Sequence, residues 1–208
     1  MRKDSVRQIK RFALIVGNSH YRMAKTIPAC AKDVDLLYDT LTKLPREDCF
    51  EVYPHKDLTA QQMKEAIKRF CDVAKKEIGD KVILFFFCGH GMSSNGTNYF
   101  LPPNDDLPKE EWVSATDLLH QLAVLGSEII FLLLDCCRTM SPTTGKSFDA
   151  LTLSHLETAR DAYIVTACGP NQISLETGWL FFIYIFLFTI SLPGQRKMAF
   201  LQEHFATA

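Results

Sequence analysis

The sequence predicts an α/β fold in which a mostly parallel, doubly wound sheet is flanked by helices. Three runs, at 12–16, 81–87 and 128–134, are apolar at almost every position. Strands of this kind are buried on both faces, which is typical of parallel sheets covered by helices on each side. The segments between them carry apolar residues at helical spacing, so strands and helices are expected to alternate along the chain.

The individual elements follow from these patterns in chain order. Thr59 is expected to open a helix, because its hydroxyl and Gln62 three residues later match a capping box, and the helix ends near Gly79. Ser114 is expected to cap a helix that runs through Val124. The other elements are indicated by apolar runs or by helical spacing: strands at 12–16, 50–53, 81–87, 128–134 and 162–167, and a helix at 33–44.

Composition excludes several classes of protein. The chain has 208 residues, enough for one medium domain, and its 23% charged and 47% hydrophobic residues are ordinary for a globular protein. The net charge of −1 provides no field to attract nucleic acid or an anionic membrane, so neither is an expected partner. Seven cysteines without paired spacing argue against a disulfide framework, and the charged start argues against a secretory signal. A cytoplasmic location is therefore expected.

Two polar motifs follow directly after predicted strands. Cys88-Gly-His-Gly91 comes after the third strand and Asp135-Cys-Cys-Arg138 after the fourth. Sites in parallel sheets form beyond the carboxyl ends of the strands, so His90 and Cys137 are expected to meet there. Cysteine attacks as a thiolate and needs a base, which His90 can supply. The amides of Gly91 and Cys137 are the predicted donors to a tetrahedral oxyanion.

Other roles for these residue types stay open. A lone cysteine at a strand end is more often a packing residue than a catalytic one, and that role is expected of Cys30, Cys49, Cys71 and Cys168. A zinc site is the alternative for the two motifs, although adjacent cysteines seldom both bind one ion. Its ligands would be Cys88, His90, Cys136 and Cys137. We therefore expect no metal and no cofactor.

With these residues the chain resembles the caspase-like cysteine peptidases, which comprise caspases, metacaspases and paracaspases. The resemblance extends from about residue 12 to 176 and implies a caspase-like fold and a cysteine-type endopeptidase. It implies that Cys137, directly before Arg138, is the nucleophile and His90 its partner, at roughly the ~50-residue separation of caspases. Four segments carry it: Phe12-Ala-Leu-Ile-Val-Gly-Asn18 with Tyr21-Arg22, Ala31-Lys-Asp-Val-Asp-Leu-Leu37, Phe87-Cys-Gly-His-Gly91 and Leu134-Asp-Cys-Cys-Arg138.

The resemblance also implies cleavage after arginine or lysine. Caspases bind aspartate with an arginine and a glutamine, whose positions fall here at about Ala29 and at Asp135. Asp33 and Asp135 instead match the acidic pair of paracaspases and metacaspases, and a carboxylate pair binds guanidinium through charge-assisted hydrogen bonds. Alternatively, Asp33 is a helix N-terminal residue favoured by the dipole, and Asp135 a solvated strand end. Paracaspases are the closer branch, since no His-Ser-Gly follows Arg138.

The far end of the chain departs from this pattern. Residues 179–192, Trp-Leu-Phe-Phe-Ile-Tyr-Ile-Phe-Leu-Phe-Thr-Ile-Ser-Leu, show neither helical nor strand alternation and are too few for the ~20 residues of a membrane span. A buried element is an alternative, but we expect the reading frame to pass into aberrant sequence after about Gly178. The expected organisation is a C-terminally truncated caspase-like catalytic domain at 1–177 and an atypical hydrophobic tail at 178–208.

The predicted function is cleavage of protein substrates in proteolytic signalling or cell death. The resemblance implies dimerisation through the C-terminal part of the domain, so a second copy or relatives of the same family are the expected partners. Because that part departs from the pattern, the alternative is a catalytically impaired protein that acts as a binding or decoy partner. The presence of His90 and Cys137 favours the enzyme, and the altered terminus favours the alternative.

Overall fold

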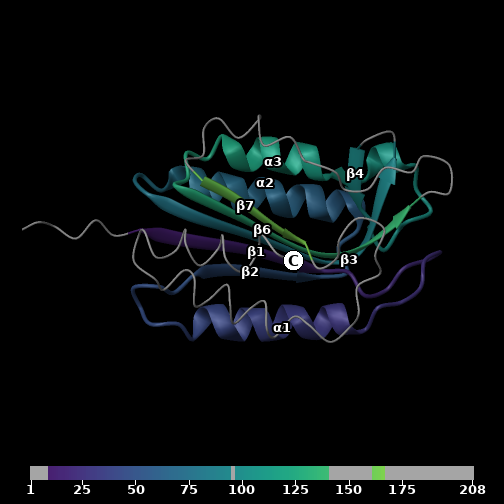
Figure 1. Cartoon of the computed structure of the whole chain (residues 1–208), viewed down its shortest axis with the longest axis horizontal. Coiled ribbons are helices and arrows are strands. Elements are labelled where there is room, and N and C mark those ends of the chain that lie inside the picture. Colours follow the sequence, from purple (N-terminus) through teal and green to yellow (C-terminus); the bar gives the residue numbers. More distant parts are fainter. Residues whose placement is uncertain (1–8, 95–96, 141–160, 167–208) are drawn as a thin grey trace, which may run out of the picture. The chain divides into compact units, whose positions relative to one another are not determined.

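A computed structural model describes residues 9–94, 97–140 and 161–166; at 93, 137–140, 161, 162 and 164–166 it describes the main chain alone. Figure 1 shows a sheet between two helical layers, with α1 (Ala29–Thr42) on one face and α2 (Ala60–Lys76) and α3 (Ala115–Ala123) on the other. The predicted α/β class with a mostly parallel sheet is confirmed. The tail at 178–208, with the boundary before it, and Cys168 lie outside the described residues.

The strand order creates a switch point at the centre of the sheet. From β1 (Lys10–Gly17) the chain moves outward to β2 (Glu51–Lys56), then returns past β1 to β3 (Lys81–Ser94). Sites in such sheets form at the carboxyl ends of the strands where the order reverses, here between β1 and β3. The sheet continues from β3 to β6 (Ile129–Met140) and β7 (Asp161–Thr166), all in parallel.

A short antiparallel extension builds onto the end of β3. β4 (Thr97–Phe100) pairs antiparallel with β3 from Gly91 to Ser94, and β5 (Val113–Ser114) pairs with β4. A 3-10 helix at Lys109–Glu111 precedes β5. None of these three elements was predicted, because each is too short to produce a periodic apolar pattern.

The core lies on both faces of the sheet, because successive side chains of a strand point to opposite faces. One cluster of buried residues joins alternate positions of β1, β3 and β6 to α2 and α3, including Phe12, Leu14, Phe85, Phe87 and Leu132. The intervening positions of β1 and β3 are equally buried and lie on the side of α1, which packs on β1, β2 and β3. The predicted burial of these strands on both faces is therefore confirmed.

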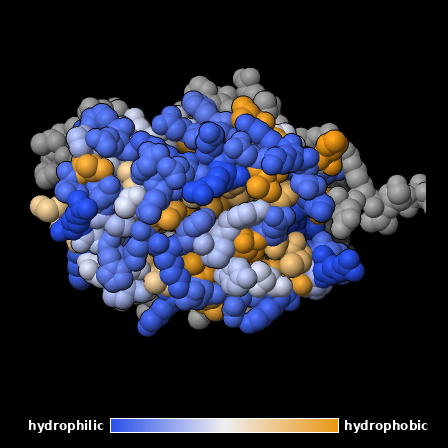
Figure 2. Space-filling view, turned by 180° about the vertical axis from the view of Figure 1, so that it is seen from behind, coloured by the Kyte–Doolittle hydropathy of each residue, from blue (hydrophilic) through white to orange (hydrophobic). Residues whose placement is uncertain are grey.

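The face in Figure 2 is mostly hydrophilic, with apolar side chains singly or in small groups, as on most globular proteins. Within the described ranges, no helix is both long enough and apolar enough to cross a bilayer.

Two of the predicted boundaries were wrong in a way that affects the site. The strands expected to end at Phe87 and Leu134 continue as β3 to Ser94 and as β6 to Met140, because their main chains pair through Ser93↔Met140. The apolar side chains end at Phe87 and Leu134, whereas backbone pairing does not depend on apolar side chains and continues beyond them. Both polar motifs therefore lie inside strands rather than in loops.

α1 also begins four residues earlier than predicted, after Pro28 at its N-cap. Asp33 thus falls in the second turn, where the helix dipole has little effect. The interpretation of Asp33 as a residue of the helix N-terminus was therefore wrong.

The predicted cap of α2 is present and can be tested. Thr59 Oγ1 accepts a hydrogen bond from the Gln62 amide, and Gln62 Oε1 accepts one from the Thr59 amide at 3.0 Å. We expect Thr59→Ala to lower the free energy of unfolding by about 1 kcal/mol in urea titration. The matched control is Thr40→Ala in α1, where the hydroxyl donates back to the Leu36 carbonyl. It should be neutral or stabilising, since alanine favours helix; equal losses in both variants would contradict the assignment.

Candidate active site

His90 is held through its main chain and its ring. Its amide donates to the Tyr21 hydroxyl at 2.9 Å, and its carbonyl accepts from the Leu101 amide at 2.9 Å. Nε2 of the imidazole lies 2.7 Å from the Lys25 carbonyl oxygen. A carbonyl oxygen can only accept, so Nε2 carries the proton and Nδ1 of the neutral ring carries the lone pair. The arrangement thus selects the tautomer in which Nδ1 is the base.

Cys137 lies beside His90 in the sheet. The two are register partners across the parallel β3–β6 ladder. Adjacent strands run about 5 Å apart, so the two main chains are neighbours, as the two motifs predicted. Only the main chain of Cys137 is described. Its role as nucleophile stays a prediction.

Tyr21 connects the end of β1 to His90. Its hydroxyl donates to the Asn18 carbonyl at 2.8 Å while accepting from the His90 amide. Its ring lies 4.8 Å from the imidazole between centroids, with an interplanar angle of 54°. Burial raises the pKa of Tyr21 well above its ordinary value, so the phenol keeps the proton that it donates to Asn18.

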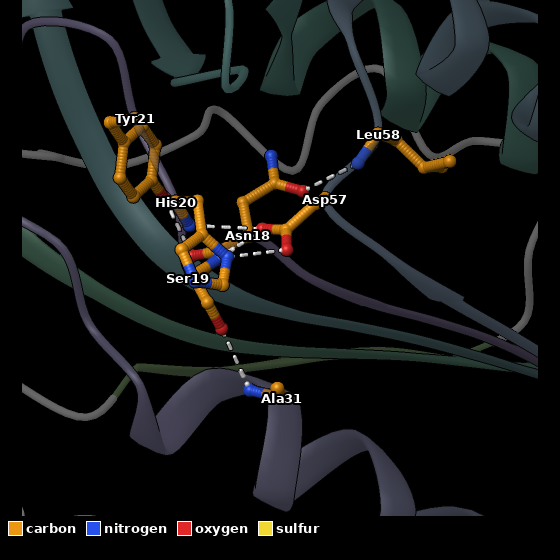
Figure 3. Close-up of polar contacts among 7 residues, drawn as sticks. All are labelled: Asn18, Ser19, His20, Tyr21, Ala31, Asp57 and Leu58. Carbon is orange, nitrogen blue, oxygen red and sulfur yellow. Dashed lines mark hydrogen bonds and ion pairs between the residues drawn. The ribbon is translucent and has the colours of Figure 1, made fainter.

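The loop after β1 is anchored by side chains that bond to distant main chain (Figure 3). Asn18 is fully buried; its amide nitrogen donates to the Leu101 carbonyl at 2.9 Å and its amide oxygen accepts from the Leu58 amide at 3.1 Å. Ser19 Oγ accepts from the Ala31 amide at 3.0 Å. That amide is one of the unpaired donors of the first turn of α1, so Ser19 supplies the cap that Pro28 lacks.

Asp57 fixes the same loop from the end of β2. One of its oxygens accepts from the amides of Ser19 at 2.6 Å and His20 at 3.0 Å, and the other lies 2.8 Å from His20 Nδ1. Burial raises the pKa of Asp57, but these hydrogen bonds outweigh it, so the pKa lies below its ordinary value. Asp57 also has a left-handed φ of 51°, which aspartate tolerates better than most residues.

Asp105 anchors the next part of the loop, immediately before Lys25. Its carboxylate accepts three successive amide protons, from Arg22 at 3.1 Å, Met23 at 2.9 Å and Ala24 at 2.8 Å. The Arg22 guanidinium also pairs with Asp106. The Lys25 carbonyl, which contacts His90 Nε2, therefore directly follows a segment whose main-chain amides are held by Asp105.

The predicted acidic pair is assembled around Cys88. Cys88 Sγ lies 3.6 Å from an oxygen of Asp33 and 3.6 Å from an oxygen of Asp135. The three ligand atoms all lie within 4.8 Å of one another, with Cys88 buried and both aspartates half-buried. A thiol has one proton and can donate to only one carboxylate at a time. Two carboxylates in this position favour a cation between them.

The ionisation of the group follows from its surroundings. Hydrogen bonding to Cys30, burial and the charge of Asp135 raise the pKa of Cys88 far above its ordinary value, so Cys88 is a neutral thiol. Burial raises the pKa of Asp33, and the hydrogen bond from Cys88 opposes this shift. Cys88 is thus a donor to the carboxylates and not a nucleophile.

The zinc site considered from the sequence is not assembled. Cys136 is buried in the cluster beneath α2 and α3, whereas Cys88 contacts Asp33 of α1 on the other face. Among the described residues the one group with the spacing of metal ligands is Asp33, Cys88 and Asp135. Three ligands fall short of the four of a structural zinc site and the six or more oxygens of calcium.

The predicted oxyanion donors lie in strand ladders. Gly91 pairs with Phe100 of β4 and Arg138 of β6, and Cys137 pairs with His90. Their role stays a prediction. Of the cysteines expected to pack, Cys30 and Cys71 are buried and Cys49 is partly buried.

Sequence reasoning missed several residues that position the site. The chain offered a signal for Tyr21, which stands in one of the quoted motifs, but none for its bond to the His90 amide. The Lys25 carbonyl has no sequence signal at all, because any residue supplies one. Asp57 and Asp105 are ordinary turn residues in the sequence, and their bonding to loop amides depends on the fold.

The anchoring by Asp57 predicts a pH-dependent contribution to stability. Because its pKa is lower in the folded state, this contribution is complete above the unfolded value of about 4 and is lost as the pH falls through the folded value. We expect Asp57→Ala to lower the free energy of unfolding by about 1–2 kcal/mol at pH 7, and by progressively less below about pH 4.

The control is Asp35→Ala, which removes an exposed carboxylate paired with Lys56. Surface pairs contribute little, so this variant should change stability by less than about 1 kcal/mol. If Asp57→Ala lowered the free energy of unfolding by the same amount at every pH, the ionised carboxylate of Asp57 would not be what holds the loop.

Comparison with known proteins agrees with the fold. A family model described as Caspase domain matches residues 10–200 of the chain. No curated protein matches the sequence.

Proposed function

Because the chain belongs to the caspase domain family, we propose that it is a cysteine endopeptidase that cleaves protein substrates after arginine or lysine. The observation that carries the proposal is the orientation of His90. Its Nε2 proton is directed to the Lys25 carbonyl, and its main chain is paired with that of Cys137. A neutral imidazole with an available Nδ1 is the base that a cysteine nucleophile requires.

The proposed reaction uses this pair in two proton transfers. Nδ1 of His90 takes the proton of the Cys137 thiol, and the thiolate attacks the carbonyl carbon of the scissile peptide bond. The imidazolium then returns the proton to the leaving amine, which leaves an acyl-enzyme thioester for water to hydrolyse. The Lys25 carbonyl stabilises the imidazolium between these steps, since its partial negative charge faces Nε2.

Stabilisation of the tetrahedral oxyanion is assigned to the amides of Gly91 and Cys137. Each donor of this kind contributes roughly 3 kcal/mol to the transition state. Both residues belong to strand segments, so the proposal requires that substrate binding leaves their amides directed at the scissile carbonyl.

The substrate side chain is proposed to bind between Asp33 and Asp135. The two carboxylates lie on either side of Cys88, at a separation that suits a guanidinium or ammonium group. Such a group can donate hydrogen bonds to both carboxylates at once, whereas the single thiol proton of Cys88 can reach only one. An aspartate side chain would meet like charge there and be rejected. Cleavage after basic residues is consistent with the paracaspase and metacaspase branch.

The biological setting is proposed on the same basis. We expect action on cytoplasmic proteins in proteolytic signalling or cell death, with a second copy or a relative of the same family as partner. A form that binds arginine-ending peptides without turnover would indicate the alternative, a catalytically impaired binding or decoy protein.

Turnover of peptide reporters tests the catalytic pair. The full chain should cleave arginine-ending reporters faster than aspartate-ending ones. Cys137→Ala and His90→Ala should each lower kcat by about 1,000-fold or more, since each removes a reacting group. The control is Cys49→Ala, a partly buried cysteine outside the site, which should leave kcat unchanged. Faster cleavage of the aspartate reporter, or activity that survives Cys137→Ala, would refute the proposal.

The acidic pair predicts a distinct pH dependence. The pKa of Asp33 is raised, so its carboxyl is still partly protonated at pH values above about 4, the ordinary pKa of an aspartate. Binding of a basic side chain requires the ionised carboxylate. The KM for an arginine-ending reporter should therefore fall as the pH rises through this range. Asp33→Asn should raise KM about 10- to 100-fold and flatten the dependence.

The comparison variant is Asp39→Asn on the exposed side of α1, where the carboxylate pairs with Lys43. It should leave KM and its pH profile as in the wild type. An Asp33→Asn enzyme with wild-type KM would show that the substrate side chain binds elsewhere.

A further inference from the structure

We propose that Tyr21 is a positioning residue for His90, which holds the imidazole in the orientation that the chemical step requires. The inference rests on the proposed function, because positioning matters only if His90 is the base. It adds a residue on the loop after β1 to the machinery on β3 and β6. Tyr21 acts through His90 and is not itself assigned any contact with substrate.

The Tyr21 hydroxyl links the end of β1 to the main chain of β3. A single hydroxyl is shared between the Asn18 carbonyl at 2.8 Å and the His90 amide at 2.9 Å. It bridges the carboxyl end of β1 and the extended part of β3, which are the two sides of the switch point. The main-chain amide of Asn18 donates to the Cys88 carbonyl at 2.9 Å, so a second hydrogen bond joins the same two segments.

The Tyr21 ring also packs against the His90 ring. The tilted packing at 4.8 Å places the phenol ring beside the imidazole, while the Lys25 carbonyl holds Nε2 at 2.7 Å. A ring fixed at one nitrogen can still rotate about that contact. Packing from Tyr21 restricts this rotation and so defines the direction of Nδ1.

The glycine before His90 leaves the space that the Tyr21 hydroxyl occupies. A Cβ built on Gly89 would lie 2.6 Å from the Tyr21 hydroxyl oxygen and 2.9 Å from the Phe87 ring. Any side chain at position 89 would displace the phenol from the His90 amide. The absence of a side chain in Cys88-Gly-His-Gly91 therefore has a local reason, which is the approach of Tyr21 to the main chain of β3.

The hydrogen bonds of Tyr21 can hold His90 throughout the reaction, because the phenol does not ionise near neutral pH. The phenol stays protonated, so its bonds to Asn18 and His90 persist while His90 gains and loses its proton. Misplacement of a catalytic group by about 1 Å can lower the rate about 100-fold. Loss of Tyr21 should thus reduce kcat and leave the binding of the basic side chain at Asp33 and Asp135 unaffected.

The test compares Tyr21→Phe and Tyr21→Leu with Tyr38→Phe, a control on the exposed side of α1. Tyr21→Phe removes the hydrogen bonds and keeps the ring, and Tyr21→Leu removes both. With arginine-ending reporters and activities normalised to folded protein, we expect kcat to fall about 10-fold in the first and about 100-fold in the second. KM should stay within twofold. A kcat within twofold of wild type in both variants would overturn the proposal, as would a rise in KM that accounts for the whole loss.

A second measurement does not depend on turnover. Nitrogen NMR of labelled histidine, with the His90 signals assigned by their loss in His90→Gln, reports which ring nitrogen carries the proton. Wild-type protein should show the Nε2–H tautomer with a single sharp Nδ1 resonance, and Tyr21→Leu a broadened or doubled Nδ1 resonance as the ring rotates about the Nε2 contact; an Nδ1 resonance that stays single and sharp would overturn the proposal. If the wild type has no activity but this spectral change occurs, the proposed function fails and the positioning of His90 by Tyr21 stands.

Discussion

The parallel pairing of β3 with β6 determines the geometry on which the whole site depends. The ladder continues beyond the apolar segments, and its register sets Cys88 opposite Asp135 and His90 opposite Cys137. The proposed catalytic pair and the proposed substrate-binding aspartate are therefore spaced by the same backbone hydrogen bonds, two residues apart on each strand. A slip of one residue would turn each side chain to the opposite face of the sheet and separate both pairs at once.

The loop after β1 supplies the remaining constraints. Tyr21 and the Lys25 carbonyl contact His90 from this loop, and the loop is held in turn by Asp57 and Asp105. Because these carboxylates bond to main-chain amides, the loop has a defined path without a large apolar core of its own. The strands thus set the main-chain positions of His90 and Cys137, and the anchored loop sets the orientation of the His90 ring.

Much of the fold could be predicted from the sequence, because apolar runs and helical spacing report burial directly. The capping box at Thr59 and the meeting of the two polar motifs were likewise visible. The extension of β3 past Phe87 was not, because backbone pairing leaves no trace in side-chain hydrophobicity. Nor was the bond from His90 to the Lys25 carbonyl, since main-chain groups are the same at every position. Asp33 and Asp135, paired through the family resemblance, lie on either side of the Cys88 thiol, and their role as a substrate pocket stays a prediction. The helical position of Asp33 was misjudged.

We propose that one site combines a cysteine nucleophile with an acidic pocket. An irreversible peptide probe that ends in arginine, followed by mass spectrometry of the labelled residue, tests this proposal. On this proposal we expect a single modification at Cys137, which free arginine-ending peptide suppresses and aspartate-ending peptide does not. Labelling of Cys88 or Cys136 in its place, or labelling that ignores the arginine, would contradict it.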